Sequence, residues 1–514
     1  MTMTRTTSAL SLGLLSLGLL ASACQNIPDE APPVTLAPVT VEQQDAKAEW
    51  PDEPFRAERP TPRAIAPVEI PTFETFTLSN GLEVYLIQQQ TLPTVMMLFE
   101  FNQGSVTDPA RKAGLSGVCA DLLDESTKTK DKASFAAAQD DHAVSVWASG
   151  GSESSTVGVR ALQHKLPEAL DLAAEMMLEP GMRSEDFEVL KDQRKNGVEQ
   201  SKGSPSSIAY RVFPSLIWGA KHPYGQLETD ESIDAISLSD CKKWVAKLEP
   251  KGNKVWVVGK VGADELKKQL EDRLGKWTGS APVRRKVGAA KHAEGTMFFI
   301  HVPDAAQSQI IVGHPGPARD AADYEATQMV AAILGGSFSS RINMNLREDK
   351  GWAYGARGSF AYTPAGSYFN AGSSVRTDAT GGALREIAKE IQTMRTTDPT
   401  AEELSREQAG ALLGMPARFA TATRSLYQFR SLAYYGLPLD WHVGHQERLR
   451  KLDIPAVRAA AETHLQASGH VVLVVGDAKV VLEDLEKIAA EGIYGKGGLK
   501  FLDADGQPAK RPKI

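Results

Sequence analysis

The sequence lacks the short motifs that mark most hydrolases and nucleotide-binding enzymes. It contains no H-E-x-x-H, no C-x-x-C, no phosphate-binding P-loop and no G-x-S-x-G pattern. Ten histidines are scattered over 514 residues, and the H-x-x-H pair His442 and His445 lies in a segment with a surface-helix pattern. We expect this pair to be solvated or to serve packing. Because these motifs are missing, the sequence gives no support for catalysis by a serine or cysteine nucleophile or for phosphate chemistry.

Positive charge is also scarce. Lysine and arginine number 57 against 64 acidic residues, which gives a formal charge of -7, and no basic tract interrupts the chain. Nucleic-acid binding normally requires a basic patch or stripe. The sequence therefore excludes nucleic acid as the main partner.

Cysteine is limited to Cys24, Cys119 and Cys241. In an oxidising compartment the latter two could pair. Cys119, however, belongs to the apolar stripe of a predicted helix, where free cysteines are commonly buried. We expect two free, buried thiols.

The first residues read as an export signal. Arg5 precedes an apolar run that is too short for a comfortable membrane span, and small residues follow it, so residues 1–23 are predicted to be a signal peptide. "LLASAC" resembles a bacterial lipoprotein processing site that ends in Cys24, although Ala21 stands where leucine is usual. Gln25 resembles the sorting pattern for the outer membrane. We expect lipidation of Cys24 and a place on the periplasmic face of the outer membrane; the alternative is a plain signal peptide with a chance cysteine.

The remaining chain divides by composition. Ten prolines between Gln25 and Pro71 predict an extended tether over 24–71, because this stretch has too few apolar residues for a core. A polar linker over 281–294 separates two halves of similar size, 72–280 and 295–493. The tail over 494–514 is expected to be loosely ordered.

The two halves resemble each other. "VWVVGKVGADELKKQLEDRL" recurs in outline as "VVLVVGDAKVVLEDLEKI", "ALDLAAEMM" as "ALREIAKEI", and "SEDFEVLKDQ" as "TAEELSREQA", at offsets of 216, 214 and 216 residues. A near-constant offset in three places indicates a duplicated unit of about 210 residues. Strands such as "GLEVYLI" and "TVMMLFEF" alternate with long amphipathic helices, which predicts an α+β fold with a mostly antiparallel sheet covered by helices in each half.

A duplicated unit with these motifs resembles the insulinase/pitrilysin-like metallopeptidases, the inverzincins. The resemblance covers about Phe73 to Ile493 and rests on "FTLSNGLEVYLI", on "HPYGQ" after Lys221, and on "GGSFSSRINMNLREDKGWAYG" from Gly335, in that order. It implies that the two halves form one half of a clamshell around a peptide.

Active members of that family carry H-x-x-E-H shortly after a Gly-Leu pair, with two zinc ligands one turn apart and a glutamate that activates water. Here the motif positions fall on Gly117, Ala120 and Asp121. The position of the third ligand falls on Gly197, and Glu199 is two residues away and would point elsewhere on a helix. We therefore expect no zinc in this chain.

The second half retains a different family feature. An arginine and a tyrosine seven residues apart reach the active site in the family, and they correspond here to Arg347 and Tyr354 in "NLREDKGWAYG". Arginine offers a planar fork of donors to a carbonyl, and a tyrosine hydroxyl stabilises an oxyanion. The alternative is that Arg347 pairs with Glu348 or Asp349 at the surface while Tyr354 packs in a sheet.

Loss of the zinc motif with retention of Arg347 and Tyr354 is typical of the zinc-less subunit of two-chain bacterial members. The resemblance implies a heterodimer with a homologous zinc-bearing subunit that cleaves extended or unfolded peptides, with zinc held only by that partner and the membrane reached through the lipid anchor. A peptide-binding or structural assembly lipoprotein is the alternative. An autonomous enzyme would have only Asp121 and Glu199 to work with.

Overall fold

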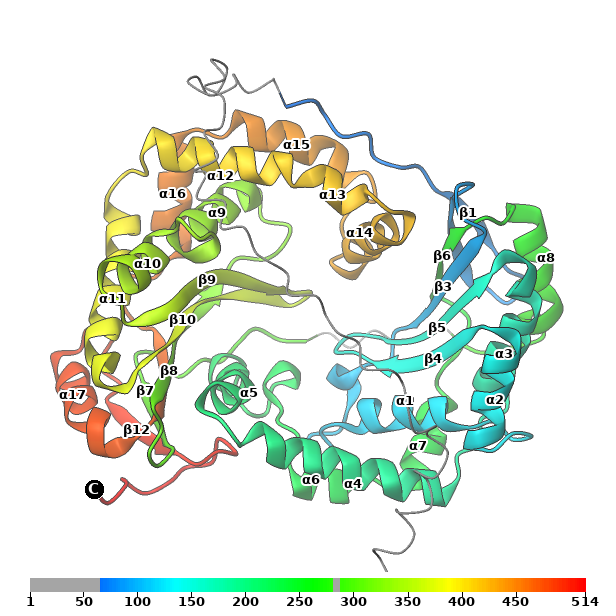
Figure 1. Cartoon of the computed structure of the whole chain (residues 1–514), viewed down its shortest axis with the longest axis horizontal. Coiled ribbons are helices and arrows are strands. Elements are labelled where there is room, and N and C mark those ends of the chain that lie inside the picture. The colour runs from blue at the N-terminus through cyan, green and yellow to red at the C-terminus, as the bar shows by residue number, and fades with distance from the viewer. Residues whose placement is uncertain (1–64, 281–286) are drawn as a thin grey trace, which may run out of the picture. The chain divides into compact units, whose positions relative to one another are not determined.

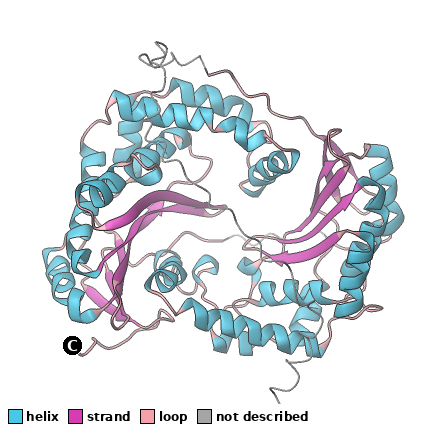
Figure 2. Ribbon diagram, in the orientation of Figure 1, coloured by secondary structure: helices cyan, strands magenta, loops and turns pink. Residues whose placement is uncertain are grey.

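The computed structural model describes residues 65–280 and 287–514, which hold two six-stranded sheets with helices packed on them (Figures 1 and 2). The first sheet has the order β1-β2-β6-β3-β5-β4 and the second β12-β7-β11-β8-β10-β9. The predicted α+β fold with two related halves is confirmed. The signal peptide, Cys24 and most of the tether lie outside the described residues.

The first sheet is antiparallel except where β2 runs parallel to β6. Its strands are β1 (Glu74–Thr77), β2 (Glu83–Gln88), β3 (Thr94–Phe101), β4 (Ser145–Gly150), β5 (Ser155–Leu162) and β6 (Lys254–Gly259). The buried runs of β3 and β6 explain their near-continuous apolar sequences, since both strands lie in the interior of the sheet. β4 forms one edge.

The second sheet repeats this order with one exception. Its strands are β7 (Met297–His301), β8 (Gln307–Gly316), β9 (Ala353–Thr363), β10 (Gly366–Arg376), β11 (Val471–Gly476) and β12 (Leu499–Leu502). β7, β11, β8, β10 and β9 occupy the places of β2, β6, β3, β5 and β4. The place of β1 is taken by β12, which comes from the end of the chain and runs parallel to β7.

The expectation of a loosely ordered tail is therefore wrong. Phe501 and Leu499 pair with β7, and Tyr494 before them is buried and donates a hydrogen bond from its hydroxyl to Leu384 O at 2.5 Å. The edge of β7 offers unpaired backbone groups, and the tail satisfies them. Composition alone did not show this because "LKFL" is a short strand among glycines and lysines.

Helices cover the sheets in both halves. In the first half they are α1 (Leu115–Glu125), α2 (Lys132–His142), α3 (Leu166–Leu178), α4 (Ser184–Ser201), α5 (Pro205–Trp218), α6 (Asp230–Asp234), α7 (Leu238–Val245) and α8 (Ala263–Leu274). In the second half they are α9 (Tyr324–Ala331), α10 (Arg341–Asn343), α11 (Thr380–Thr396), α12 (Ala401–Leu413), α13 (Met415–Phe419), α14 (Ala422–Tyr434), α15 (Trp441–Lys451), α16 (Ile454–His464) and α17 (Ala478–Glu491). Among the described residues, no helix combines the length and apolar character needed to cross a membrane.

One helix from each half packs on the sheet of the other half. α5 packs its apolar face, including Val212 and Phe213, on β8 and β11 of the second sheet. In return α14 places Leu426, Phe429 and Leu432 on the face of the first sheet that is opposite to its own helices α3 and α8 (Figure 1). Each buried side chain of this size contributes about 1.5–3 kcal/mol, so the exchange stabilises the association of the halves.

The two buried cysteines form a disulfide, which corrects the expectation of free thiols. Cys119 of α1 and Cys241 of α7 are joined with their Cα atoms 4.9 Å apart, 122 residues apart in sequence. Both were placed correctly in the apolar core. Sequence periodicity placed Cys119 on the apolar face of a helix but could not show that Cys241 lies against that face.

The described part begins inside the predicted tether. Val68 exchanges two hydrogen bonds with the Gln446 side chain of α15, at 2.8 and 2.9 Å, and Ile65 packs against the second core. The last residues of the Pro-rich stretch thus lie along the second half.

Candidate functional site

Helix α1 carries the degenerate motif. It begins after Gly114, whose φ of 95° is left-handed and favours glycine, and its apolar stripe of Leu115, Val118 and Leu122 is buried in the first core. Gly117 and Asp121 are one turn apart and share a face, as the two ligand positions of the family do.

The space above Gly117 is filled by an arginine from a neighbouring helix. A Cβ atom built on Gly117 would lie 1.7 Å from Nη2 of Arg194, on α4. The same Nη2 lies 3.7 Å from Oδ2 of Asp121, and Nε of Arg194 lies 3.9 Å from Oε2 of Glu228. A guanidinium between two carboxylates therefore stands beside the first ligand position. The sequence analysis missed Arg194, although its place three residues before Gly197 puts both on one helix face.

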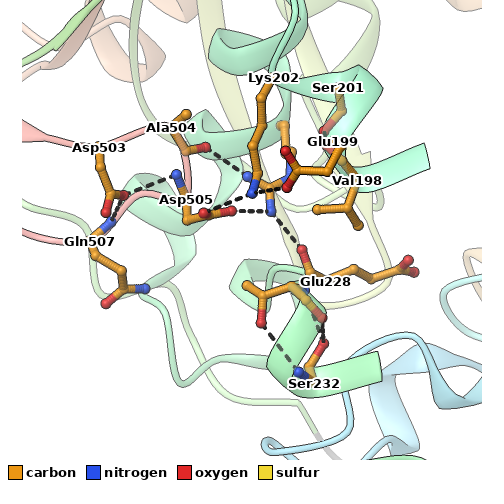
Figure 3. A network of polar contacts seen from close by, with 12 residues as sticks. Val198, Glu199, Ser201, Lys202, Glu228, Ser232, Asp503, Ala504, Asp505 and Gln507 are labelled. Carbon is orange, nitrogen blue, oxygen red and sulfur yellow. Dashed lines mark hydrogen bonds and ion pairs between the residues drawn. The ribbon is translucent and has the colours of Figure 1, made fainter. Parts of the chain in front are cut away.

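The third ligand position carries no donor. Gly197 has open space where a Cβ would be. Glu199 pairs with Lys202, Oε1 to Nζ at 2.7 Å, and Lys202 in turn lies 2.9 Å from Asp505 of the C-terminal tail (Figure 3). Glu199 is thus engaged away from the motif, as its offset predicted.

The residues present do not fit a catalytic zinc ion. Gly117, Ala120 and Gly197 have no donor atoms, and Arg194 adds a positive charge where a metal would need anionic or neutral ligands. Within residues 65–280 and 287–514 no three histidine, cysteine or acidic side chains gather closely enough to hold a metal.

Burial and mutual repulsion raise the pKa values of the carboxyls on this face. The pKa of Asp121 is raised by burial and by Glu228 and Glu125, against the lowering effect of Arg194. Burial raises the pKa of Asp124 to about 7, although a backbone hydrogen bond from Ala148 opposes the shift. Burial is therefore the main cause of both shifts, and Arg194 acts in the opposite direction on Asp121.

The pair His442 and His445 is a packing feature. Both are buried, and Nδ1 of His445 lies 2.8 Å from Oε1 of Glu325, which also accepts from Nε of Arg448 at 2.8 Å. The His445 ring stacks on Trp441, and the His442 ring meets Trp441 edge to face. The expectation that this pair serves packing agrees with its burial.

The structure brings Arg347 and Tyr354 together at the surface. Arg347 lies on a π-helical turn (Met344–Asp349), and its Cζ is 5.0 Å from the ring centre of Tyr354 and 4.8 Å from that of Phe338. Its Nε also lies 3.1 Å from Oε1 of Glu348. Tyr354 is the second residue of the edge strand β9 and is 87% exposed, so it does not pack in the sheet. Phe338 was missed because a single aromatic in "GGSFSS" carries no spacing signal.

A cavity lies between the first sheet and helix α14 of the second half. Its volume is about 450 Å³, and its walls include Trp147 and Gly150 of β4 with Tyr427, Arg430 and Tyr434 of α14. Gly150 also touches the degenerate site, since a Cβ there would lie 2.7 Å from Ser116 O. The end of edge strand β4 thus lies between this cavity and Gly117.

Comparison with known proteins agrees with this geometry. Residues 83–222 match the model of the insulinase family, peptidase family M16, and residues 235–411 match the model of the peptidase M16 inactive domain. The chain therefore belongs to the insulinase family, and it is of the inactive subunit type.

Individual relatives are distant. A non-peptidase homolog, YmxG of Helicobacter pylori, is 23% identical over 78% of this chain and 93% of its own length. An uncharacterized zinc protease of Mycobacterium leprae is 26% identical over 54% of this chain, and the match spans only 63% of that protein. The crystal structure of a peptidase M16 inactive domain from Pseudomonas fluorescens has the same fold, with a TM-score of 0.72 and 22% identity over 79% of this chain and 98% of that one. The periplasmic protease PqqL of Escherichia coli aligns with a TM-score of 0.67 and 14% identity over 81% of this chain but 48% of its own.

Proposed function

We propose that this chain is the non-catalytic, substrate-binding subunit of a zinc metallopeptidase of the cell envelope, and that it completes the active site of a homologous zinc-bearing partner. The observation that carries the proposal is a contrast between the halves. The first half has no metal ligands around Gly117, whereas the second half presents Tyr354, which is open to solvent, beside the partly exposed Arg347, which also pairs with Glu348.

The chemistry of the exposed pair suits that role. At an active site shared with a zinc-bearing partner, the Tyr354 hydroxyl would donate a hydrogen bond to the negative charge that develops on the scissile carbonyl oxygen as water attacks. The guanidinium of Arg347 can hold a second main-chain carbonyl through two parallel donors. The free edges of β4 and β9 offer backbone groups to which an extended peptide can add as a strand, with little dependence on its sequence.

Two further observations support pairing and an envelope location. The chain matches about half of the periplasmic protease PqqL, whose greater length can accommodate a second unit of this kind. The Cys119–Cys241 disulfide is typical of proteins that fold in an oxidising compartment, which agrees with the expected signal peptide and with lipidation of Cys24.

Reconstitution tests this proposal. The chain, a homologous H-x-x-E-H protein recovered with it by co-purification, and the mixture of the two would each be assayed on a fluorogenic unfolded peptide. We expect cleavage by the mixture and little by either chain alone. Cleavage by this chain alone, or full activity of the partner without it, would contradict the proposal. Co-purification with an envelope complex that lacks peptidase activity would instead favour the structural alternative.

A further inference from the structure

The guanidinium of Arg194 lies between the carboxylates of Asp121 and Glu228 but makes only long contacts with them. Its separations from the carboxylate oxygens of Asp121 and Glu228, 3.7 and 3.9 Å, exceed the length of a hydrogen bond. Its Nε is buried and donates no hydrogen bond within the described part of the chain. About a third of the side chain, 34%, is nevertheless exposed to solvent. Because Nε itself is buried, a ligand would have to be bound by the terminal Nη atoms of this cation.

We propose that Arg194 binds a main-chain carbonyl oxygen of an extended peptide at the position vacated by the metal. This inference rests on the proposed function, because it assigns a peptide contact to the non-catalytic subunit. Arginine is suited to such a contact because its planar fork directs several donors toward one acceptor group. The contact would retain peptide without activating water, so binding remains where hydrolysis is lost.

The surroundings leave an approach open. Gly117 and Gly197 flank Arg194 and place no side chain over it, and a Cβ at Gly197 would meet nothing within 4 Å. The end of edge strand β4 lies against α1 at this point, since a Cβ at Gly150 would be 3.0 Å from Gly117 Cα. A peptide paired with β4 would thus pass close to Arg194.

The charge balance favours a neutral acceptor over an anion. Arg194 carries one positive charge, whereas Asp121 and Glu228 carry two negative charges when ionised. A carbonyl oxygen accepts a hydrogen bond without adding a full charge. A C-terminal carboxylate would be repelled by the same acids. We therefore assign the site to an internal carbonyl of the peptide rather than to its terminus.

A binding measurement on the full chain tests the assignment. The probe is an unfolded peptide, acetylated at its N-terminus, amidated at its C-terminus and labelled with a fluorophore, and the readout is fluorescence anisotropy. We expect Arg194→Met to weaken binding by about tenfold or more, as the loss of hydrogen bonds to a charged group implies. Arg194→Lys should restore part of the affinity, because it keeps the charge but not the fork.

A matched control lies next to Arg194 on the same helix. Lys195 pairs with Asp234 at 3.1 Å rather than with the motif face, so Lys195→Met should bind as the original chain does. Unfolding curves of all variants show whether a loss of binding reflects a loss of fold. A second arm repeats the titration with the same peptide ending in a free carboxylate.

Three outcomes would overturn the inference: no binding of the capped peptide by the unaltered chain, equal binding by Arg194→Met, or a dependence on Arg194 limited to the peptide with a free carboxylate. None of these decides the proposed function, which is judged by cleavage in the reconstituted pair. The inference is supported if binding of the capped peptide depends on Arg194 and is unchanged in the Lys195→Met control.

Discussion

Gly117 and Arg194 are sterically complementary: a Cβ on residue 117 would lie 1.7 Å from Nη2 of Arg194. A histidine cannot occupy position 117 unless the arginine moves. The positions of the family's metal ligands thus carry no donor atoms at 117 and 197, and the guanidinium of Arg194 stands beside them. A variant that restores only a histidine at position 117 should therefore not bind zinc.

Zinc binding should depend on Arg194. We expect the unaltered chain to hold no stoichiometric zinc, and the variant with Gly117→His, Asp121→His and Gly197→Glu to hold none either, because the guanidinium occupies the site and repels the metal. Adding Arg194→Ala should allow one zinc per chain. Metal analysis after dialysis measures this. Equal zinc content with and without Arg194 would refute the steric and electrostatic argument.

The disulfide should contribute substantially to stability. Cys119→Ala combined with Cys241→Ala opens a link that spans 122 residues, and we expect the free energy of unfolding to fall by about 2–5 kcal/mol. Urea unfolding without reductant measures the change. Mass spectrometry after alkylation in denaturant provides the control, since modification of Cys119 and Cys241 before reduction would show that the disulfide is absent.

Stability should fall in mild acid because burial lowers the pKa values of several histidines, among them His470 and His314. Burial lowers the pKa of His470 to about 3 and that of His314 to about 4, from an ordinary value of 6.5. Above pH 6.5 neither state binds these protons. As pH falls from 6.5 the unfolded chain takes them up first, so each histidine should cost about 2 kcal/mol by about pH 5, with little further change below the folded pKa.

Urea unfolding at about pH 7.5 and about pH 5 measures this effect. We expect His470→Leu to remove the share of His470 from the acid-induced loss of stability. The exposed His164 offers a comparison, and His164→Gln should leave the pH dependence as it is. An unchanged dependence in His470→Leu would assign the acid sensitivity to other groups.

Lipidation is tested at Cys24, which lies outside the described residues. Cys24→Ser should abolish fatty-acid labelling and shift the protein out of the membrane fraction, because lipoprotein processing requires the cysteine thiol. Unchanged labelling of the variant would show that the lipoprotein interpretation is wrong. Unchanged fractionation without labelling would point to another attachment.

Much of the fold was predictable because it repeats. Equivalent strands and helices recur at a near-constant offset, and alternation and apolar runs marked β2 and β3 with nearly correct bounds. The sequence could not show that α5 and α14 are exchanged between the sheets. An amphipathic pattern fixes which face of a helix is buried, but not the surface that buries it.

The residues of the candidate site that occupy motif positions could be predicted from the sequence. The residue that reaches the site only through the packing of two helices could not. Gly117, Asp121 and Gly197 were found by alignment of a spacing, whereas Arg194 became evident only from its contact across two helices. The same reason hid the disulfide and the strand made by the tail. Each depends on contacts between segments that are far apart in sequence.

The central claim is that this chain completes the active site of its partner through Arg347 and Tyr354. Tyr354→Phe removes one hydroxyl from a side chain that is 87% exposed, so the variant should fold and associate normally. Peptide turnover by the reconstituted pair should nevertheless fall by about a hundredfold or more, as is typical of losing one oxyanion donor. Full turnover by the Tyr354→Phe pair, with subunit association confirmed in parallel, would contradict the claim.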